Sequence, residues 1–510
     1  MEKNFYITTP IYYPSEKFHI GHCYTTIIAD AISRYKRLDG YDVFFQTGTD
    51  EHGQKIANKA EANEVTPKEY VDKIIADAKD LWSELGITYD YFIRTTDEDH
   101  KEKVGKIFTK LYEQGDIYKG SYEGLYCVPC ESFWTESQLV DGKCPDCGRE
   151  VKLVEEESYF FKLSKYQDKL LELYEKNPNF ILPISRKNEL VNNFIKPGLE
   201  DLCVTRTSVE WGIKVPFDTD HTIYVWIDAL SNYITSLGYP DVDSEKFKKF
   251  WPANLHLVGK EITRFHAIIW PALLMALDVE LPEKVFGHGW LIINGGKISK
   301  SLGNYEDPRE YVKKFGVDAV RYYALKEVPV GSDGSFSIDS LISRANSDLA
   351  NTLGNLVTRT VSMSHKYFDG YVNNLNVIED CDKELIDSAN NLKTLVDEKI
   401  EALKINEAIE IIMEHLRLTN KYIDLTTPWV LAKEESSKDR LQTVLYNLIE
   451  SIRISSILLE AFIPETSNKI LEVINTKKTT FEFLNFGELE ENLLLNEPVI
   501  IYSRIEGIDE

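Results

Sequence analysis

The chain contains no apolar run of the length that crosses a bilayer, about 20 residues. Its first residues, MEKNFYITTPIYY, lack the basic and apolar segments and the small-residue cleavage site of a secretory signal. Cysteine is scarce, with seven in 510 residues, and positive charge is scarce too, with 58 Lys and Arg against 83 Asp and Glu. The net charge of -25 argues against general nucleic-acid affinity, although a local basic track is compatible with it. We therefore expect a cytoplasmic protein in a reducing compartment, with no membrane segment.

The hydrophobic pattern alternates between strand and helix periods in the first hundred residues. FYITTPIYY, YDVFFQTGT and YDYFIRT have strand character, and helical patterns separate them. After a different pattern between about residues 112 and 221, alternation resumes with TIYVWIDAL, NLHLVGK, a helical EITRFHAIIWPALLMAL and EKVFGHGWLIING. Such alternation predicts a parallel sheet with crossover helices, interrupted by an insertion. From about residue 340 to 474 the pattern is helical almost throughout, which predicts a helical bundle.

Four of the seven cysteines form two closely spaced pairs inside the insertion. CVPC supplies Cys127 and Cys130, and CPDC supplies Cys144 and Cys147 after thirteen intervening residues. This spacing is typical of a tetrahedral zinc site. Four thiolates fill the coordination shell, so we expect a structural zinc, with an iron site of the rubredoxin type as the minor alternative. A filled shell also leaves no position for a substrate thiolate.

Two histidines lie where a helical pattern begins, in the segment FHIGH. A helix that starts at the carboxyl end of a strand directs free N–H groups toward a ligand. His19 and His22 add side-chain donors suited to phosphate oxygens, and Gly21 leaves room for a flat base. On these four residues from His19 to His22 alone, two ordinary surface histidines would be the better interpretation.

A second segment, NGGKISKSLGN, places two lysines between glycines and asparagines. Lys297 and Lys300 are three residues apart and can face one polyanion. Together, FHIGH and KISKS resemble the paired HIGH and KMSKS signatures of the class I aminoacyl-tRNA synthetases, with isoleucine in place of methionine. The resemblance implies that the histidines contact the phosphates of ATP, that Gly21 admits adenine, and that the lysines stabilise departing pyrophosphate. The residues it implies for catalysis and for binding ATP with Mg²⁺ are His19, Gly21, His22, Lys297, Ser299 and Lys300.

Within that class, the chain resembles the enzymes specific for methionine. TPIYYPSEKFHIGH, QTGTDEHGQKI, RTSVEWGIKVP, YVWIDALSNYI and GKEITRFHAIIWPA carry this resemblance, which is dense over residues 1–340. It implies formation of methionyl-adenylate and transfer of methionine to tRNA(Met). The methionine-binding residues it implies are Ile11, Tyr13, Asp50, Trp226, Ala229, Leu230, Tyr233, Ile262, His266 and Trp270.

Individual roles in this pocket follow from the same resemblance. Asp50 matches the residue that holds the substrate ammonium, and Tyr13 and His266 are expected to offer donors to the thioether, a weak acceptor. Arg206 is a candidate for the substrate carboxylate. Leu230 stands where many relatives have proline, and Glu261 stands where GKDI is commoner, so its contacts are undecided.

The helical part of the chain is expected to read an anticodon. Asn355 and Arg359 are four residues apart and therefore share one helix face. Trp429 follows a proline and can stack on an unpaired base. The resemblance implies that these three residues read CAU.

The predicted fold class is α/β: a Rossmann-type parallel sheet split by a zinc-binding insertion, followed by an α-helical bundle domain. The predicted segments are 1–114 and 223–294 for the two catalytic halves, 115–222 for the insertion, 295–344 for the KISKS loop and stem-contact region, and 345–510 for the anticodon-binding domain. The chain ends where a further dimer-forming module begins in many relatives, so we expect a monomer.

Three other functions remain open on the sequence. Another class I synthetase is the nearest, above all one for cysteine, because pocket identity is taken from matched positions. A catalytically idle paralogue that binds tRNA would have no need for the intact histidines and lysines. A small nucleotidyltransferase would share the phosphate-binding histidines but would need neither the helical domain nor the cysteine cluster.

Overall fold

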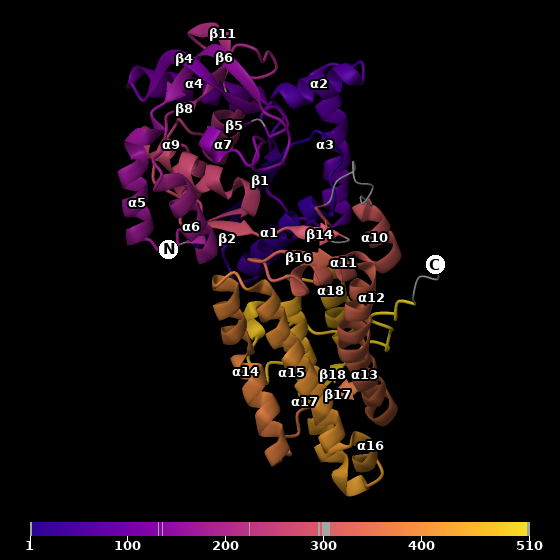
Figure 1. The fold of residues 1–510 in the computed structure, drawn as a ribbon. Helices are drawn as coiled ribbons and strands as arrows, with labels where there is room; N and C mark the ends of the chain where they lie inside the picture. The colour runs from indigo at the N-terminus through magenta and orange to yellow at the C-terminus, as the bar shows by residue number, and fades with distance from the viewer. Residues whose placement is uncertain are drawn as a thin grey trace. The chain divides into compact units, whose positions relative to one another are not determined.

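A computed structural model describes residues 3–130, 132–134, 136–223, 225–293, 296–297 and 307–506. The chain separates into two compact units (Figure 1). Unit 1 comprises Met1–Ala29, Asp42–Ser83 and Thr88–Gly289, and unit 2 comprises Asp30–Tyr41, Glu84–Ile87 and Trp290–Glu510. No helix among the described residues is both long enough and apolar enough to cross a membrane.

Unit 1 is built on a six-stranded sheet in which every pairing is parallel, as the alternation predicts. Its order is β3 (Tyr91–Arg94), β2 (Asp42–Thr49), β1 (Asn4–Tyr12), β12 (Leu255–Gly259), β13 (Val285–His288) and β7 (Ile181–Leu182). The central strands are buried along nearly their whole length because helices cover both faces of a parallel sheet. On one side of β1 the sheet continues with β2 and β3, and on the other side with β12 and β13. The direction in which strands are added therefore reverses between β1 and β12. A ligand site is expected at the carboxyl ends there.

Helices follow the strands of the parallel sheet, and they include the helical patterns that separate the first three strands and the helical EITRFHAIIWPALLMAL. They are α1 (Ile20–Leu38), α2 (Gln54–Ala62), α3 (Pro67–Glu84), α4 (Glu98–Glu113), α7 (Val225–Thr235), α8 (Glu245–Phe250) and α9 (Trp270–Leu277). TIYVWIDAL changes from strand to helix within itself, since β11 ends at Ile223 and α7 begins at Val225. The helical EITRFHAIIWPALLMAL contains one π-helical segment, Phe265–Ile269, directly before α9.

The segment that interrupts the sheet is mainly antiparallel. One sheet has the order β5 (Ser132–Trp134), β4 (Ile117–Cys127), β6 (Lys152–Phe161) and β8 (Leu202–Cys203), and another has the order β10 (Lys214–Val215), β11 (Asp218–Ile223) and β9 (Thr205–Arg206). Helices α5 (Gln167–Lys176) and α6 (Ile184–Leu190) follow β6. β7 lies within this segment, yet it pairs with β13 at the edge of the parallel sheet. The interruption is therefore tied to the sheet that it splits.

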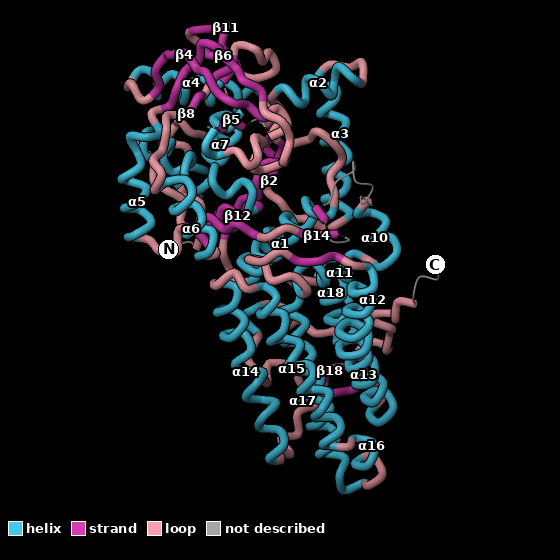
Figure 2. The backbone as a smooth tube through the Cα atoms, viewed as in Figure 1, coloured by secondary structure: helices cyan, strands magenta, loops and turns pink. Residues whose placement is uncertain are grey.

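Unit 2 is predominantly helical, which confirms the predicted bundle (Figure 2). Its helices are α10 (Pro308–Phe315), α11 (Val317–Lys326), α12 (Ile338–Arg344), α13 (Asn355–Phe368), α14 (Asp380–Glu401), α15 (Ile405–Thr426), α16 (Pro428–Leu431), α17 (Lys438–Leu459) and α18 (Pro464–Ile474). Two small sheets accompany them: β15 (Gly296–Lys297), β14 (Leu291–Ile293) and β16 (Gly334–Phe336) in one, and β17 (Tyr371–Val372) with β18 (Leu493–Leu494) in the other. α17 is buried along nearly its whole length and forms the centre of the bundle.

Candidate active site

Polar residues of unit 1 lie at the carboxyl ends of strands β1, β2 and β13. Tyr13 follows β1, Asp50 follows β2, and His288 ends β13. The backbone N–H of Asp50 donates to the carbonyl of Tyr12 at 2.9 Å, which ties the ends of β1 and β2 together. These residues therefore lie at the edge of the sheet where the strand order predicts a ligand.

The two predicted histidines of FHIGH lie against each other at the start of α1. Their ring centroids are 4.0 Å apart, and both side chains are half-buried. Nδ1 of His22 accepts the backbone N–H of His19 at 3.1 Å, and Nδ1 of His19 accepts that of Gly21 at 3.1 Å. The rings thus cap N–H groups at the helix start through their Nδ1 atoms.

The protonation of His22 follows from these contacts. Burial, with the neighbouring His19 ring as a second cause, holds the pKa of His22 well below its usual value. The neutral ring carries its proton on Nε2, because Nδ1 is an acceptor. Phe18 stacks on the ring at 4.7 Å and Tyr12 meets it edge-on at 5.3 Å, so this Nε2–H donor is held in a fixed orientation.

Gly21 has a second reason to be glycine that the sequence does not reveal. A Cβ at this position would come within 2.9 Å of Cε1 of His19 and 3.0 Å of its Nδ1. The absent side chain therefore lets the His19 ring fold back over the helix start, where it accepts the N–H of Gly21.

The TGTDEHG segment after β2 is anchored by a buried carboxylate that the sequence did not single out. Glu51 is fully buried and receives Nε and Nη2 of Arg94 at 2.7 and 2.8 Å. Hydroxyl groups of Thr49 and Thr96 donate to the same carboxylate at 2.7 and 2.6 Å. The N-cap of α2 is Gly53, so the neighbouring Asp50 does not serve as a helix cap. Glu51 thus fixes the loop that presents the buried Asp50.

A buried chain of two histidines and a carboxylate joins this loop to α7. Asp228 accepts from Nδ1 of His52 at 2.5 Å and from Nε2 of His100 at 2.8 Å. Burial alone would raise the pKa of Asp228, but the two histidines outweigh it and hold the pKa below its usual value. The carboxylate is therefore ionised, and it fixes the helix that carries Trp226, Ala229, Leu230 and Tyr233.

The predicted methionine pocket is aromatic and tightly hydrogen-bonded around Tyr233. The Tyr233 ring lies 5.8 Å from Trp270 and 4.3 Å from His256, between ring centroids. Nε1 of Trp270 donates to Nε2 of His256 at 3.2 Å, so the single N–H of the neutral His256 ring is on Nδ1 and donates to the Thr8 hydroxyl at 2.7 Å. Trp226 stacks on Phe265 at 3.6 Å with the planes 8° apart. His256 and Phe265 were not predicted, because no local spacing marks them.

The structure does not support the expected role of His266 as a donor to the thioether. Its Nδ1–H donates to the carbonyl of Ile262 at 3.0 Å, and its Nε2 accepts from the Tyr233 hydroxyl at 2.6 Å. Burial lowers the pKa of His266 to about 4, so the ring is neutral near pH 7. Neither nitrogen has a hydrogen left for sulfur, and His266 instead fixes Tyr233.

The remaining predicted residues of unit 1 are placed as follows. Ala229 and Leu230 are buried on α7, while Ile11 and Ile262 are half-buried. Lys55 lies 5.3 Å from the Tyr13 ring centroid. Arg206 is buried, its guanidinium 4.2 Å over Tyr126 and Nη2 donating to Ser208. Glu261 is exposed, and its carboxylate lies over Gly259, where a Cβ would be 2.7 Å away.

The four predicted cysteines converge in space. Their sulfur atoms all lie within 4.8 Å of one another, with Cys127 and Cys147 3.6 Å apart and Cys130 and Cys144 3.9 Å apart. A tetrahedral ion with metal–sulfur bonds of about 2.3 Å requires sulfur separations of about 3.8 Å. The cluster therefore fits a four-coordinate metal ion.

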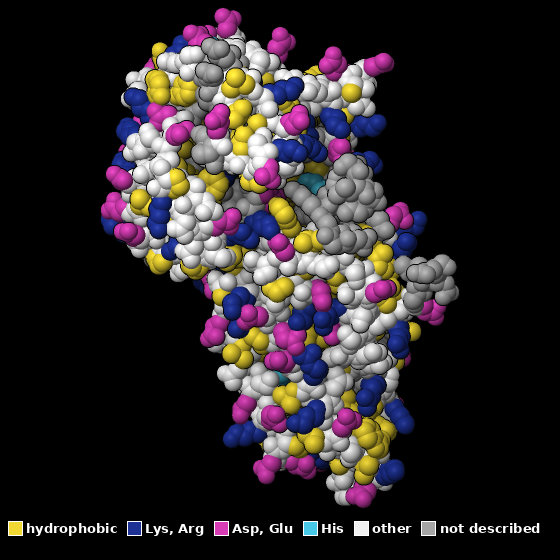
Figure 3. All heavy atoms as spheres, in the orientation of Figure 1, with side chains coloured by type: hydrophobic (Ala, Val, Ile, Leu, Met, Phe, Trp, Pro, Cys, Tyr) yellow, Lys and Arg dark blue, Asp and Glu magenta, His cyan; other side chains and the backbone are white. Residues whose placement is uncertain are grey.

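The two remaining predicted sites belong to unit 2. Lys297 lies on β15, and its backbone pairs with Ile292 of β14. Ser299 and Lys300 lie outside the described residues. Asn355 and Arg359 are exposed on the same face of α13, and Trp429 on α16 is 42% exposed. Figure 3 shows Lys and Arg side chains interspersed with acidic ones on the face that it draws of this unit.

Because of two buried histidines, His266 and His415, we expect the free energy of unfolding to fall in mild acid. Burial lowers the pKa of both His266 and His415 to about 4, whereas an unfolded histidine titrates near 6.5. Below pH 6.5 the unfolded chain binds protons that the folded chain does not, so stability falls as pH drops toward 4. Each histidine contributes up to about 1.4 kcal/mol per pH unit. Melting temperatures between pH 7 and 5 should fall less steeply for His415→Gln than for the parent; equal slopes would contradict this.

Family models, curated proteins and solved structures of known function are similar to this chain. The family model "tRNA synthetases class I (M)" matches residues 5–155 and 148–361, and "Anticodon-binding domain of tRNA ligase" matches 382–505. Methionine–tRNA ligase of Caldanaerobacter subterraneus subsp. tengcongensis is 61% identical over 99% of this chain and 80% of its own length. The Bacillus subtilis methionine–tRNA ligase is 50% identical over 99% of the chain and 78% of its own length. A crystal structure of Mycobacterium tuberculosis methionyl-tRNA synthetase bound by methionyl-adenylate matches with a TM-score of 0.95 and 43% identity, covering 98% of this chain and 100% of that one.

Proposed function

The chain belongs to the methionine–tRNA ligases of class I, and on that premise we propose its reaction and the residues that perform it. It activates methionine with ATP to methionyl-adenylate and pyrophosphate, and then transfers methionine to the 3′ end of tRNA(Met). The observation that carries this function is the near-complete match to a structure that holds the adenylate intermediate itself.

The start of α1 binds the triphosphate. The fixed Nε2–H of His22 and the Nε2 of His19 interact with phosphate oxygens. Gly21 is assigned to adenine, which needs the space beside this glycine that the His19 ring fills in this structure. Attack of the methionine carboxylate on the α-phosphate needs alignment and charge stabilisation rather than a covalent enzyme intermediate. Lys297, Ser299 and Lys300 bind the pyrophosphate end of ATP and stabilise it as it leaves. Mg²⁺ accompanies ATP and neutralises phosphate charge.

Methionine is selected by an aromatic pocket with one buried acid. Asp50, held by the Glu51 anchor, receives the substrate ammonium. Tyr13, Trp226, Tyr233 and Trp270 surround the flexible side chain, whose polarizable sulfur favours aromatic contacts. The hydrogen bond from Tyr233 to His266 fixes the pocket wall, which leaves Tyr13 as the donor for sulfur.

The helical unit selects the tRNA. Asn355 and Arg359 present polar groups from one face of α13, and the exposed ring of Trp429 offers a stacking surface. Unpaired bases are recognised by such stacking combined with hydrogen bonds to their edges. We assign these three residues to the CAU anticodon. We also propose a cytoplasmic enzyme that acts as a monomer.

The four-cysteine cluster holds a structural zinc ion, and its removal gives a direct prediction. Metal analysis of the purified protein should give one zinc and no iron per chain. Cys130→Ser should lose that zinc and melt at a lower temperature, because zinc binding contributes directly to folding. Cys203→Ser, a buried cysteine outside the cluster, is the matched control and should keep the metal. Folded, active protein without zinc would overturn the assignment.

The function is tested by amino-acid-dependent exchange of pyrophosphate into ATP across all standard amino acids. Exchange with methionine alone would support both the reaction and the pocket. Exchange with another amino acid would preserve the class I mechanism but overturn the pocket assignment. Folded, zinc-loaded protein that exchanges with none would favour a tRNA-binding paralogue without catalysis.

A further inference from the structure

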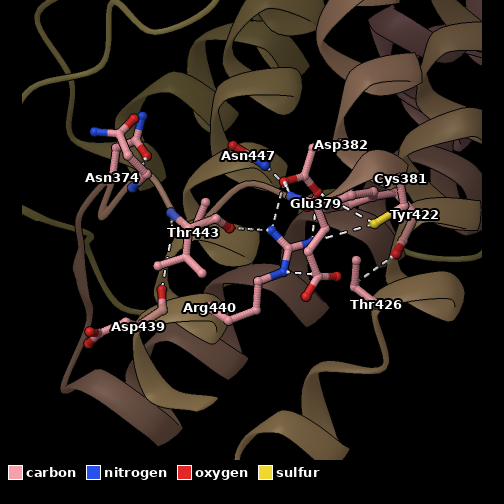
Figure 4. Close-up of polar contacts among 12 residues, drawn as sticks. Asn374, Glu379, Cys381, Asp382, Tyr422, Thr426, Asp439, Arg440, Thr443 and Asn447 are labelled. Carbon is pink, nitrogen blue, oxygen red and sulfur yellow. Dashed lines mark hydrogen bonds and ion pairs between the residues drawn. The ribbon is translucent and has the colours of Figure 1, made fainter. Parts of the chain in front are cut away.

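A buried ion pair joins two helices of unit 2 (Figure 4). Arg440 lies in the first turn of α17, and Asp382 lies in the first turn of α14. Nη1 of Arg440 donates to Oδ2 of Asp382 and Nη2 donates to Oδ1, both at 2.7 Å. Asp382 is completely buried and Arg440 is 5% exposed. This two-pronged geometry fixes the relative position of the two helix ends.

Tyr422 extends this network to the last turn of α15. Its hydroxyl donates to Oδ1 of Asp382 at 2.6 Å and accepts from Nδ2 of Asn447 on α17 at 3.1 Å. The carbonyl of Tyr422 accepts the hydroxyl of Thr426 at 2.7 Å. Figure 4 shows Tyr422 and Arg440 approaching the Asp382 carboxylate from different helices. Three helices therefore meet at one carboxylate, and the network ends at the last residue of α15.

The next residue has a backbone conformation that the surroundings must impose. Thr427 has φ 41° and ψ 62°, in the left-handed region that a β-branched residue rarely adopts. Such a conformation costs free energy and persists only where neighbouring structure determines it. It turns the chain directly into α16, where Pro428 is buried and Trp429 is exposed. The geometry of this turn decides where the indole lies.

We propose that Asp382, Arg440 and Tyr422 are positioning residues for anticodon recognition: they hold the end of α15 so that the Thr427 turn presents Trp429. The proposal rests on the function assigned to Trp429 above. A carboxylate held by several directed donors can fix the position of a helix end more narrowly than apolar packing, which allows helices to slide. The three side chains of the network are buried, so it acts through the exposed indole.

Asp382→Asn and the milder Tyr422→Phe test the proposal in the full chain. Asp382→Asn should raise the KM for tRNA about tenfold, as expected when most of one base-stacking interaction is lost. Tyr422→Phe should raise it less, because only one hydroxyl is removed. Methionine-dependent pyrophosphate exchange should stay within about twofold for both variants, since that step does not involve the anticodon.

A double-mutant cycle with Trp429→Ala separates positioning from general stabilisation. Where Trp429 is already absent, Asp382→Asn should change the KM for tRNA by less than about twofold, because both substitutions remove one interaction. Fully additive effects would overturn the proposal. Trp429→Ala that leaves the KM unchanged would remove Trp429 from recognition and the proposal with it, while methionine exchange would still report the enzymatic function.

A second buried ion pair on the same helix provides the matched control. Glu450 is fully buried, receives Nε and Nη2 of Arg453 at 2.6 and 2.8 Å, and accepts the N–H groups of Gly487 and Glu488. Glu450→Gln should lower the melting temperature yet leave the KM for tRNA within about twofold, because its partners hold a different segment. An equal rise in KM for Glu450→Gln and Asp382→Asn would mean that any weakened bundle loses tRNA, which would overturn the specific role.

Discussion

Replacing His22 by asparagine is expected to lower the rate of methionine-dependent pyrophosphate exchange on the order of 10²–10³-fold, the usual result of losing one aligned donor to a transition state. The Oδ1 atom of asparagine can take the place of Nδ1 and accept the N–H of His19, so the helix start is preserved. Asparagine has no atom at the position of Nε2, and the donor to phosphate is lost. Steady-state exchange kinetics, with methionine affinity measured separately, provide the test.

His22→Gln is the complementary variant. The glutamine amide nitrogen can reach the position of Nε2, but no acceptor remains near Nδ1 for the backbone of His19. We expect this variant to retain more activity than His22→Asn and to melt at a lower temperature. If His22→Asn kept near-parental exchange, His22 would be a helix cap alone, and the phosphate role assigned to it would be wrong.

The parts that could be predicted from sequence are those set by local spacing. Strand and helix periods predicted the parallel sheet and the bundle, because one turn of helix or one pleat of strand determines each period. Two CxxC pairs predicted a metal cluster, since each pair forms a short knuckle and only their meeting needed the structure. His19 and His22 also lie together because they are three positions apart at one helix start.

The parts that escaped prediction depend on contacts between distant segments. Asp228 meets His52 across 176 positions and His100 across 128, and no pattern near any of them indicates a shared hydrogen-bond chain. The short strand β7 joins the sheet edge from within the insertion, where two residues carry too little periodicity to be recognised. His266 was assigned a donor role because its partners, the Ile262 carbonyl and the Tyr233 hydroxyl, are visible only in three dimensions.

Lys300→Ala is expected to reduce the activation step on the order of 10²–10³-fold, comparable to the loss of an aligned charge at a transition state. Negative charge accumulates on the pyrophosphate oxygens as the bond to the α-phosphate breaks, and a lysine ammonium acts there as a point charge. An interaction made mainly in the transition state lowers kcat without changing ground-state affinity. The dissociation constant for methionine should therefore stay within about twofold, because methionine binds at a different group of residues.

Two further variants separate charge from loop structure in this prediction. Lys300→Arg keeps the positive charge and should recover part of the lost rate, although the planar guanidinium is no exact substitute for an ammonium. Ser299→Ala removes a neighbouring hydroxyl without changing charge and should cost far less than Lys300→Ala. The measurement is the single-turnover rate of methionyl-adenylate formation at saturating ATP. A near-parental rate in Lys300→Ala would remove Lys300 from the mechanism. A loss in Lys300→Arg as large as in Lys300→Ala would mean that the shape of the ammonium, and not its charge alone, is required at the departing pyrophosphate.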